Sequence, residues 1–152
     1  MNNPIALFQK WFDEESALSE VNIPTAVCLS TLGFDGFPNA RFISLKEIRN
    51  DSFVVTGPLQ SRKGIEIEAD NKVALTFWWT GTGRQVRIQG EANKIPESLA
   101  TVYFNARNEH SKAVSVISEQ GKVTNNIIAL EQEILDKVAE NQTIPKPKSW
   151  GG

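Results

Sequence analysis

Residues 25–48 read TAVCLSTL-GFDG-FP-NARFISLKEI, and this stretch decides the fold. Two runs rich in β-forming residues, 25–32 and 39–48, flank the turn signal Gly33-Phe34-Asp35-Gly36. Asp-Gly between such runs is a strong short-range signal for a β-hairpin. The stretch therefore predicts two antiparallel strands joined by a tight turn.

Further strand-like segments follow this hairpin. We expect strands over 52–56, 73–79 and 84–95, with Gly57-Pro58 breaking the chain after the first of them. Short hairpin turns imply antiparallel neighbours, so at least four strands are expected to form one meander. Because a small sheet of short strands otherwise leaves exposed edges, the pattern favours a closed or nearly closed barrel.

Helical patterns lie on both sides of the strands. Asn3-Pro4 predicts a helix start, and apolar spacing extends the helix over 4–18, so residues 1–20 are assigned to an N-terminal helix. Ser61 is expected to cap a short helix that runs through Ala69, with Asn71 closing it.

The last third of the chain is expected to be helical and then extended. Pro96 opens a helix to about Arg107, and a second helix is expected over 124–140. The apolar face of the first helix is expected to hold Leu99, Val102, Tyr103 and Ala106. Residues 141–152 predict an extended tail. The fold class is thus mainly β (α+β), in one domain over 1–152 with barrel strands in 25–95 and helices in 96–140.

Composition limits the function classes. The chain has 152 residues with 16 basic and 18 acidic side chains, so the net charge is −2, which argues against a protein that coats nucleic acid. No basic-then-apolar leader and no long apolar run is present, so we expect a cytoplasmic protein without a membrane partner. The single cysteine, Cys28, is expected to be a buried inert thiol. The single histidine, His110, is expected at the surface, and no metal site is predicted.

Basic residues point to a small phosphate. Ser61-Arg62-Lys63 begins the short helix after Gly57-Pro58, and a helix start offers unpaired N–H groups and a favourable dipole. A hydroxyl, an Arg and a Lys at that place make a monophosphate site chemically plausible. Solvated surface charge is the alternative, because such triplets are common.

The predicted strand at 84–95 adds a polar face. In Arg84-Gln85-Val86-Arg87-Ile88-Gln89-Gly90, Val86 and Ile88 share one face, whereas Gln85, Arg87 and Gln89 share the other. A glutamine amide both donates and accepts, which suits the pyrimidine edge of a flavin. A solvent-facing strand face explains the same pattern. Arg41 and Lys46 are five residues apart, so a regular strand points them to opposite faces unless it bulges.

The sequence motifs of this chain, in their order and spacing, resemble those of the pyridoxamine 5′-phosphate oxidases, the FMN-dependent enzymes of vitamin B6 metabolism. The resemblance runs nearly from end to end. Its motifs are Asn3-Pro4-Ile5-Ala6-Leu7-Phe8, Trp11, Asp35-Gly36, Pro38, Arg41 to Lys46, Ser61-Arg62-Lys63-Gly64, Arg84 to Gly90, Tyr103-Phe104, Arg107, Ser111, Ser118-Glu119-Gln120, Pro145, Pro147 and Trp150-Gly151-Gly152.

The resemblance implies an antiparallel FMN-binding split β-barrel with flanking helices, working as a homodimer with FMN between subunits. The implied cofactor contacts are Arg41, Phe42, Ile43, Ser44, Leu45, Lys46, Val55, Thr56, Ser61, Arg62, Lys63, Gln85, Gln120 and Trp150, of which Gln85, Gln120 and Trp150 come from the other subunit. The implied substrate contacts are Lys46, Tyr103, Arg107 and Ser111. The implied reaction is hydride transfer from a B6 vitamer to the flavin, with oxygen reoxidising the flavin. No residue is assigned a catalytic role of its own.

Several positions depart from the family's pattern. The family continues past Trp150-Gly151-Gly152 with an aromatic-Gln-Gly stretch and an Arg-x-His motif, whereas this sequence stops at Gly152. Asn108-Glu109 stands where the family has a proline and a basic residue, which puts negative charge beside the expected substrate phosphate. We therefore expect FMN contacts to be better preserved than substrate contacts.

The departures leave several functions open. The chain is expected to be either a short relative with another substrate or a truncated form of a true oxidase. The leading hypothesis is an FMN-dependent oxidase of the pyridoxamine 5′-phosphate oxidase type, with a B6 vitamer phosphate among its candidate substrates. The alternatives are a flavin reductase that uses a nicotinamide cofactor, a non-catalytic flavin or B6-phosphate binding protein, and an interaction domain without a ligand.

Overall fold

The computed structural model describes residues 3–18, 23–140 and 142–152. The chain divides into two compact units, which are described separately: Met1–Val55 with Ala69–Ala92, and Thr56–Glu68 with Asn93–Gly152. We call them the sheet unit and the helical unit. No helix within the described ranges has the length and apolar character that a membrane span requires. The single domain over 1–152 stays a prediction.

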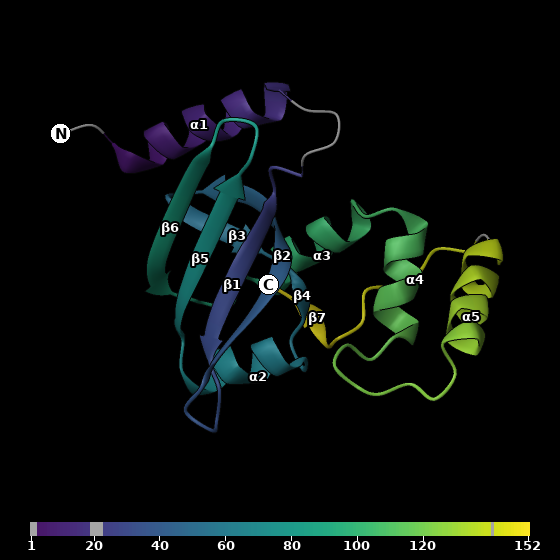
Figure 1. The fold of residues 1–152 in the computed structure, drawn as a ribbon. Helices are drawn as coiled ribbons and strands as arrows, with labels where there is room; N and C mark the ends of the chain where they lie inside the picture. Colours follow the sequence, from purple (N-terminus) through teal and green to yellow (C-terminus); the bar gives the residue numbers. More distant parts are fainter. Residues whose placement is uncertain (1–2, 19–22, 141) are drawn as a thin grey trace. The chain divides into compact units, whose positions relative to one another are not determined.

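The sheet unit is built on a five-stranded antiparallel sheet with the order β3-β2-β1-β5-β6. The strands are β1 (Ala26–Leu32), β2 (Pro38–Arg49), β3 (Ser52–Val55), β5 (Lys72–Trp79) and β6 (Arg84–Glu91). Figure 1 shows that the sheet is curled, in the manner of a half-barrel. The predicted antiparallel, mainly β architecture with flanking helices is confirmed.

The hairpin of β1 and β2 forms where it was predicted, but the connectivity of the sheet differs. Leu32 pairs with Pro38 across the turn, and Gly36 adopts a left-handed φ of 80°, which favours glycine. The predicted four-strand meander is wrong, because β5 returns to pair with β1 instead of β3. The last strand ends at Glu91 rather than at 95; the backbone N–H of Ala92 already donates to the carbonyl of Asn71 at 2.8 Å.

One face of the sheet, the inner face, carries the core of the unit. α1 (Pro4–Leu18) packs against it, which confirms the N-terminal helix over 4–18; the predicted end at 19–20 lies outside the described residues. The ring of Phe8 lies 4.9 Å from Phe53, 5.0 Å from Phe77 and 5.3 Å from Trp79 between centroids. Other buried residues of this unit are Val27, Leu29, Leu45, Val54 and Leu75. These contacts explain why the apolar residues of 4–18 follow a helical period.

The opposite, outer face of the sheet remains open within the described chain. Phe42 is 77 % exposed and Trp78 is 59 % exposed, and the register of β1, β2 and β5 puts both on this face. Cys28 lies opposite Phe42 in the register of β1 and β2. Cys28 is partly rather than fully buried, so the prediction of a buried thiol is wrong. The outer face therefore combines large apolar side chains with solvent access.

The helical unit contains four helices and two very short strands within the described residues. Its elements are β4 (Gly57–Pro58), α2 (Arg62–Ala69), α3 (Glu97–Asn105), α4 (Glu109–Ile117), α5 (Ile127–Ala139) and β7 (Trp150–Gly151). Gly57-Pro58 was predicted as a break, but it pairs antiparallel with β7. α4 was not predicted, and the tail is extended except for β7; residue 141 lies outside the described residues.

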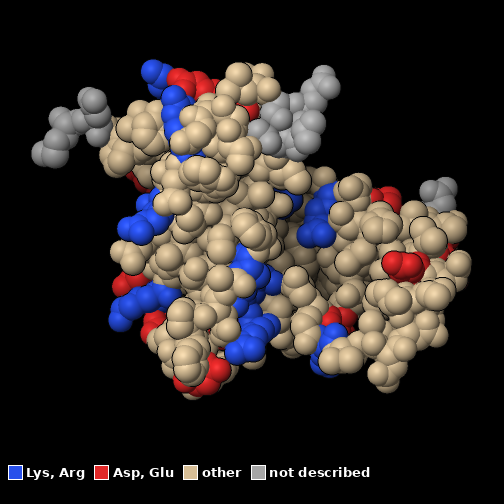
Figure 2. Space-filling model, viewed as in Figure 1, with Lys and Arg blue, Asp and Glu red and all other residues tan. Residues whose placement is uncertain are grey.

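The core of the helical unit corrects the predicted face of α3. The buried residues are Ala100, Phe104, Ala113, Ile134, Ile144 and Trp150. Val102 is 61 % exposed and Ala106 is exposed, whereas Phe104 is fully buried and meets the ring of Trp150 at 5.1 Å. The inward face is thus set by the tail that packs on it. In the view of Figure 2, both basic and acidic side chains are spread over the surface, in keeping with the net charge of −2.

Candidate functional site

The first turn of α2 is held in a tight backbone arrangement. The carbonyl of Pro58 accepts from the backbone N–H of Ser61 at 3.2 Å and from its hydroxyl at 2.7 Å. A Cβ on Gly64 would lie 2.0 Å from the carbonyl oxygen of Leu59, so only glycine fits there. The N–H of Leu59 donates to the carbonyl of Ser149 at 2.7 Å, which ties this turn to the tail.

Lys63 contacts two other predicted cofactor residues at the start of α2. Its Nζ donates to the hydroxyl of Ser61 at 3.0 Å and to Oε1 of Gln120 at 2.5 Å. Gln120 comes from the connection between α4 and α5, 57 residues away along the chain. Both of these contacts are to neutral oxygens.

Arg62 occupies the same turn but makes a different contact. Its Nε donates to Oε1 of Glu66 at 2.9 Å, one helical turn further on. The side chain of Arg62 is 61 % exposed, whereas that of Glu66 is fully buried. Glu66 was not predicted as a site residue. The available signal was its position four residues after Arg62, a spacing that brings side chains together on a helix.

A second cluster of predicted residues surrounds Arg107. Its Nη2 donates to the carbonyl of Ser111 at 3.0 Å, and its Cζ lies 5.3 Å from the ring of Trp150. Burial lowers the pKa of Arg107 from its ordinary value, yet an arginine stays protonated near neutral pH. Within the described chain, Nε of Arg107 and Nε1 of Trp150 are buried donors without a hydrogen-bond partner. A buried donor without a partner is a group that an anionic or carbonyl-bearing ligand can satisfy.

The start of α4 neutralises the acidic residue that the sequence placed near this cluster. Oδ1 of Asn108 caps the helix by accepting from the N–H of Ser111 at 2.8 Å. Glu109 forms an ion pair with Lys112 at 2.7 Å, and the Lys112 side chain is only 12 % exposed. The carboxylate of Glu109 therefore has a cation of its own. Tyr103, the remaining substrate residue predicted in this unit, packs against the core of the helical unit.

The predicted residues of β2 divide between the two faces of the sheet. Arg41 is half-buried, and its Nη1 donates to the hydroxyl of Thr31 at 2.6 Å and to the carbonyl of Leu29 at 3.3 Å. Lys46 is exposed. The register shifts between Leu45 and Glu47, so Lys46 sits in a bulge. Ile43 and Leu45 share the inner face with Arg41, and Phe42 and Ser44 lie on the outer face.

The other predicted residues of these strands are placed as follows. Gln85 is exposed on β6, opposite Trp78 in the register, which confirms the polar outer face of that strand. Val55 ends β3 and is half-buried, and Thr56 begins the helical unit. His110 is exposed, as predicted. Among the described residues, no three His, Cys, Asp or Glu side chains come together as a metal site requires.

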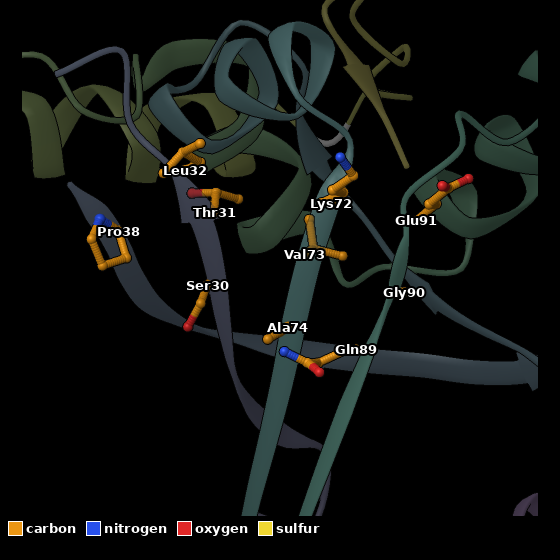
Figure 3. A pocket seen from close by; sticks show the side chains of 10 residues that line it. All are labelled: Ser30, Thr31, Leu32, Pro38, Lys72, Val73, Ala74, Gln89, Gly90 and Glu91. Carbon is orange, nitrogen blue, oxygen red and sulfur yellow. The ribbon is translucent and has the colours of Figure 1, made fainter. Parts of the chain in front are cut away.

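A hollow of about 540 Å³ opens on the sheet unit (Figure 3). It is lined by Ser30, Thr31, Leu32, Pro38, Lys72, Val73, Ala74, Gln89, Gly90 and Glu91. The lining of the hollow contains one cation, Lys72, and one anion, Glu91. These two residues are partners in the register of β5 and β6. This hollow shares no residue with the predicted cofactor or substrate sets, and its charges do not favour a phosphate.

Comparison with known proteins covers nearly the whole chain. A family model described as pyridoxamine 5′-phosphate oxidase matches residues 14–137. The chain belongs to the pyridoxamine 5′-phosphate oxidase family. It is 36 % identical over 152 residues to the pyridoxine/pyridoxamine 5′-phosphate oxidase of Flavobacterium johnsoniae. The aligned region covers 99 % of this chain and 71 % of that protein. The resemblance drawn from the motifs is thereby confirmed.

Solved structures of relatives share the fold of this family member. PhzG from Burkholderia lata 383, in complex with tetrahydrophenazine-1-carboxylic acid, superposes with a TM-score of 0.92 at 25 % identity, over 99 % of this chain and 74 % of PhzG. A pyridoxamine 5′-phosphate oxidase-related, FMN binding protein from Nostoc punctiforme superposes with a TM-score of 0.74 at 13 % identity, over 96 % of this chain and 75 % of that chain. The split-barrel fold predicted for the chain is confirmed.

Proposed function

We propose that this member of the pyridoxamine 5′-phosphate oxidase family binds FMN through the phosphate and oxidises a small substrate by hydride transfer. The supporting observation is the convergence of Ser61, Lys63 and Gln120 beside Arg62 at the first turn of α2. A helix start supplies backbone N–H donors, and the two cations supply charge. A phosphate dianion binds where both are present.

The donor set of the helical unit suits a phosphate-bearing ligand. Lys63 already donates to two neutral oxygens, so a phosphate oxygen can replace one of these acceptors without a large movement of the Lys63 side chain. Gly64 lets the turn before α2 approach the helix closely, since any Cβ would collide with Leu59. Arg107 and Trp150 hold two unsatisfied buried donors. We propose Arg107 and Tyr103 for the substrate and Trp150 for the cofactor.

When bound, FMN would supply two-electron redox chemistry for oxidation of a substrate carbon that bears an amine or alcohol, with dioxygen as the electron acceptor and hydrogen peroxide as its product. The residues of this chain bind and orient. We propose that Arg62 and Lys63 hold the cofactor phosphate, and that Arg107 and Ser111 hold the substrate's anionic group. Burial around Arg107 strengthens its attraction for an anion, because fewer water molecules screen the charge.

For the sheet unit, the family resemblance assigns the flavin ring to residues 42–46 with Val55 and Thr56, and we retain this as a proposal. Gln85 is exposed on β6 and offers the donor and acceptor that the pyrimidine edge of a flavin needs. Arg41 lies in the regular part of β2, and Lys46 lies in its bulge. We propose Arg41 for the cofactor and Lys46 for both cofactor and substrate.

We propose in addition that the protein works as a homodimer through the outer face of the sheet. Phe42 and Trp78 are exposed there by 77 % and 59 %, respectively. Large exposed apolar patches mark protein–protein interaction sites. A second copy of the chain would cover the same face on its partner, as two-fold symmetry requires.

The cofactor proposal is tested with purified protein and added flavins. We expect the protein to be yellow, with the absorbance of bound flavin, and to quench FMN fluorescence on titration. Replacing Arg62 and Lys63 with alanine is expected to weaken FMN binding by at least about 100-fold, since each charged hydrogen bond contributes about 1.5–3 kcal/mol. Riboflavin lacks the phosphate, so its affinity serves as the internal control. An unchanged FMN titration would remove the phosphate site.

The substrate is tested separately, after FMN binding has been measured. Pyridoxal 5′-phosphate formation from pyridoxamine and pyridoxine phosphates, with hydrogen peroxide counted in parallel, tests the B6 reaction. A second candidate class is planar ring carboxylates, favoured by the close structural similarity to PhzG in its complex with tetrahydrophenazine-1-carboxylic acid. Bleaching of FMN by NADH or NADPH alone would instead indicate a flavin reductase, and no turnover with any reductant would indicate a binding protein.

A further inference from the structure

We propose that Glu66 is a positioning residue that fixes the guanidinium group of Arg62 for binding a phosphate. The inference rests on the proposed function, FMN binding at the start of α2. Glu66 lies on the second turn of that helix, and its Oε1 accepts from Nε of Arg62 at 2.9 Å. The sequence motif Ser61-Arg62-Lys63-Gly64 ends before this residue, so the motif does not account for it.

The burial of the pair is unequal, and this inequality needs an explanation. The Glu66 side chain is fully buried, whereas the Arg62 side chain is 61 % exposed. A carboxylate loses a large hydration free energy when it leaves water, so a buried one is retained only where its contacts compensate. Pairs at this spacing stabilise a helix while both side chains stay in water. Helix stability alone therefore does not require Glu66 to be buried.

Fixing Arg62 gives the buried carboxylate a role. A guanidinium group held through Nε keeps one orientation, and its two terminal Nη groups are the pair that binds phosphate oxygens side by side. A long side chain that is already ordered loses less conformational entropy when the ligand arrives. Arg62 is thus held by a buried anchor while most of its surface stays accessible.

Charge compensation is the rival explanation, and it predicts the opposite sign. Arg62, Lys63 and Glu66 together carry a charge of 1 + 1 − 1 = +1. If Glu66 served only to reduce the positive charge, its neutralisation would strengthen the attraction for a phosphate dianion. If Glu66 positions Arg62, its neutralisation weakens phosphate binding in spite of the added positive charge.

The experiment compares FMN and riboflavin dissociation constants for Glu66→Gln and for the matched control Glu68→Gln. Glu68 is an exposed acid on the same helix, so its replacement makes the same change in charge. We expect Glu66→Gln to weaken FMN binding about tenfold, on the scale of one charged hydrogen bond, and to leave riboflavin binding unchanged. In an Arg62→Ala background the same replacement is expected to change FMN binding less than about twofold.

The outcomes separate the possibilities. Stronger FMN binding by Glu66→Gln, or an equal loss in both backgrounds, overturns the positioning role. If Glu66→Gln does not fold, Glu66→Asp keeps the charge but shortens the reach, and an unchanged FMN affinity in that variant overturns the proposal as well. Failure of the wild-type protein to prefer FMN over riboflavin removes the proposed function itself and is seen before any variant is made.

Discussion

Gly64→Ala is expected to destabilise the protein, although the same change in most helices stabilises. Alanine has a helix propensity about 1 kcal/mol better than glycine. At this position the new Cβ would lie 2.0 Å from the carbonyl oxygen of Leu59, and real Cβ contacts stay beyond 3.0 Å. The turn must therefore move by at least 3.0 − 2.0 = 1.0 Å, which disturbs the 2.7 Å hydrogen bond from Leu59 to Ser149.

The magnitude follows from the balance of these effects. Overpacking typically costs about 1–3 kcal/mol, and a weakened backbone hydrogen bond costs about 1 kcal/mol more. Set against the propensity gain, a net loss of about 2 kcal/mol is expected in the free energy of unfolding, measured by urea denaturation. Because the shift moves the first turn of α2, FMN affinity is expected to fall at least about tenfold, with riboflavin affinity unchanged.

Gly90→Ala is the matched control, since a Cβ at Gly90 meets nothing within 4 Å. It is expected to be neutral or slightly stabilising, by up to about 1 kcal/mol. A Gly64→Ala protein as stable as the wild type, with unchanged FMN affinity, would refute the close approach of Leu59 to α2. A loss in both variants would point to a general intolerance of alanine rather than to this contact.

Three further changes test other parts of the molecule. Glu15 is fully buried and accepts hydrogen bonds from two backbone N–H groups of the β5–β6 turn, at 3.0 and 2.8 Å. Glu15→Ala is therefore expected to lower the free energy of unfolding, measured by urea denaturation, by about 3 kcal/mol. The control Glu14→Ala removes a half-exposed ion pair and is expected to lower it by less than about 1 kcal/mol. Lys146, whose side chain is 6 % exposed, donates to the carbonyl of Trp150 at 2.9 Å; Lys146→Met is expected to loosen the tail and raise its rate of proteolysis, and unchanged cleavage would contradict this. Trp78→Lys places a charge on the outer face and is expected to yield monomers in sedimentation, with FMN affinity reduced if the partner contributes to binding; an unchanged oligomeric state would count against that interface.

Local signals were enough for much of the fold. The hairpin of β1 and β2 was predictable because Asp35-Gly36 fixes its turn and the flanking runs favour strands. α1 was predictable because its apolar residues follow one helical period. The cluster at 61–63 could be proposed for a phosphate because a helix start and two cations occur in adjacent residues.

Long-range packing decided what the sequence could not. Gly57-Pro58 looks like a break, and it becomes a strand only because β7 pairs with it across more than ninety residues. On α3 more than one apolar face is possible, and the ring of Trp150 selects the one that holds Phe104. The burial of Glu66 was likewise invisible, since acidic residues on short helices usually face solvent. The pairing of Gly57-Pro58 and the inward face of α3 both depend on partners that are distant in the chain.

The pairing of β4 with β7 has a consequence for synthesis on the ribosome. All residues of the sheet unit precede residue 93, so this unit can begin to fold while the remainder is still being translated. The turn before α2 is made much earlier than its partners, because Leu59 bonds to Ser149 and packs against Gly151. The contacts that complete this turn therefore form only after residues 149–151 have been synthesised, later than the whole sheet unit.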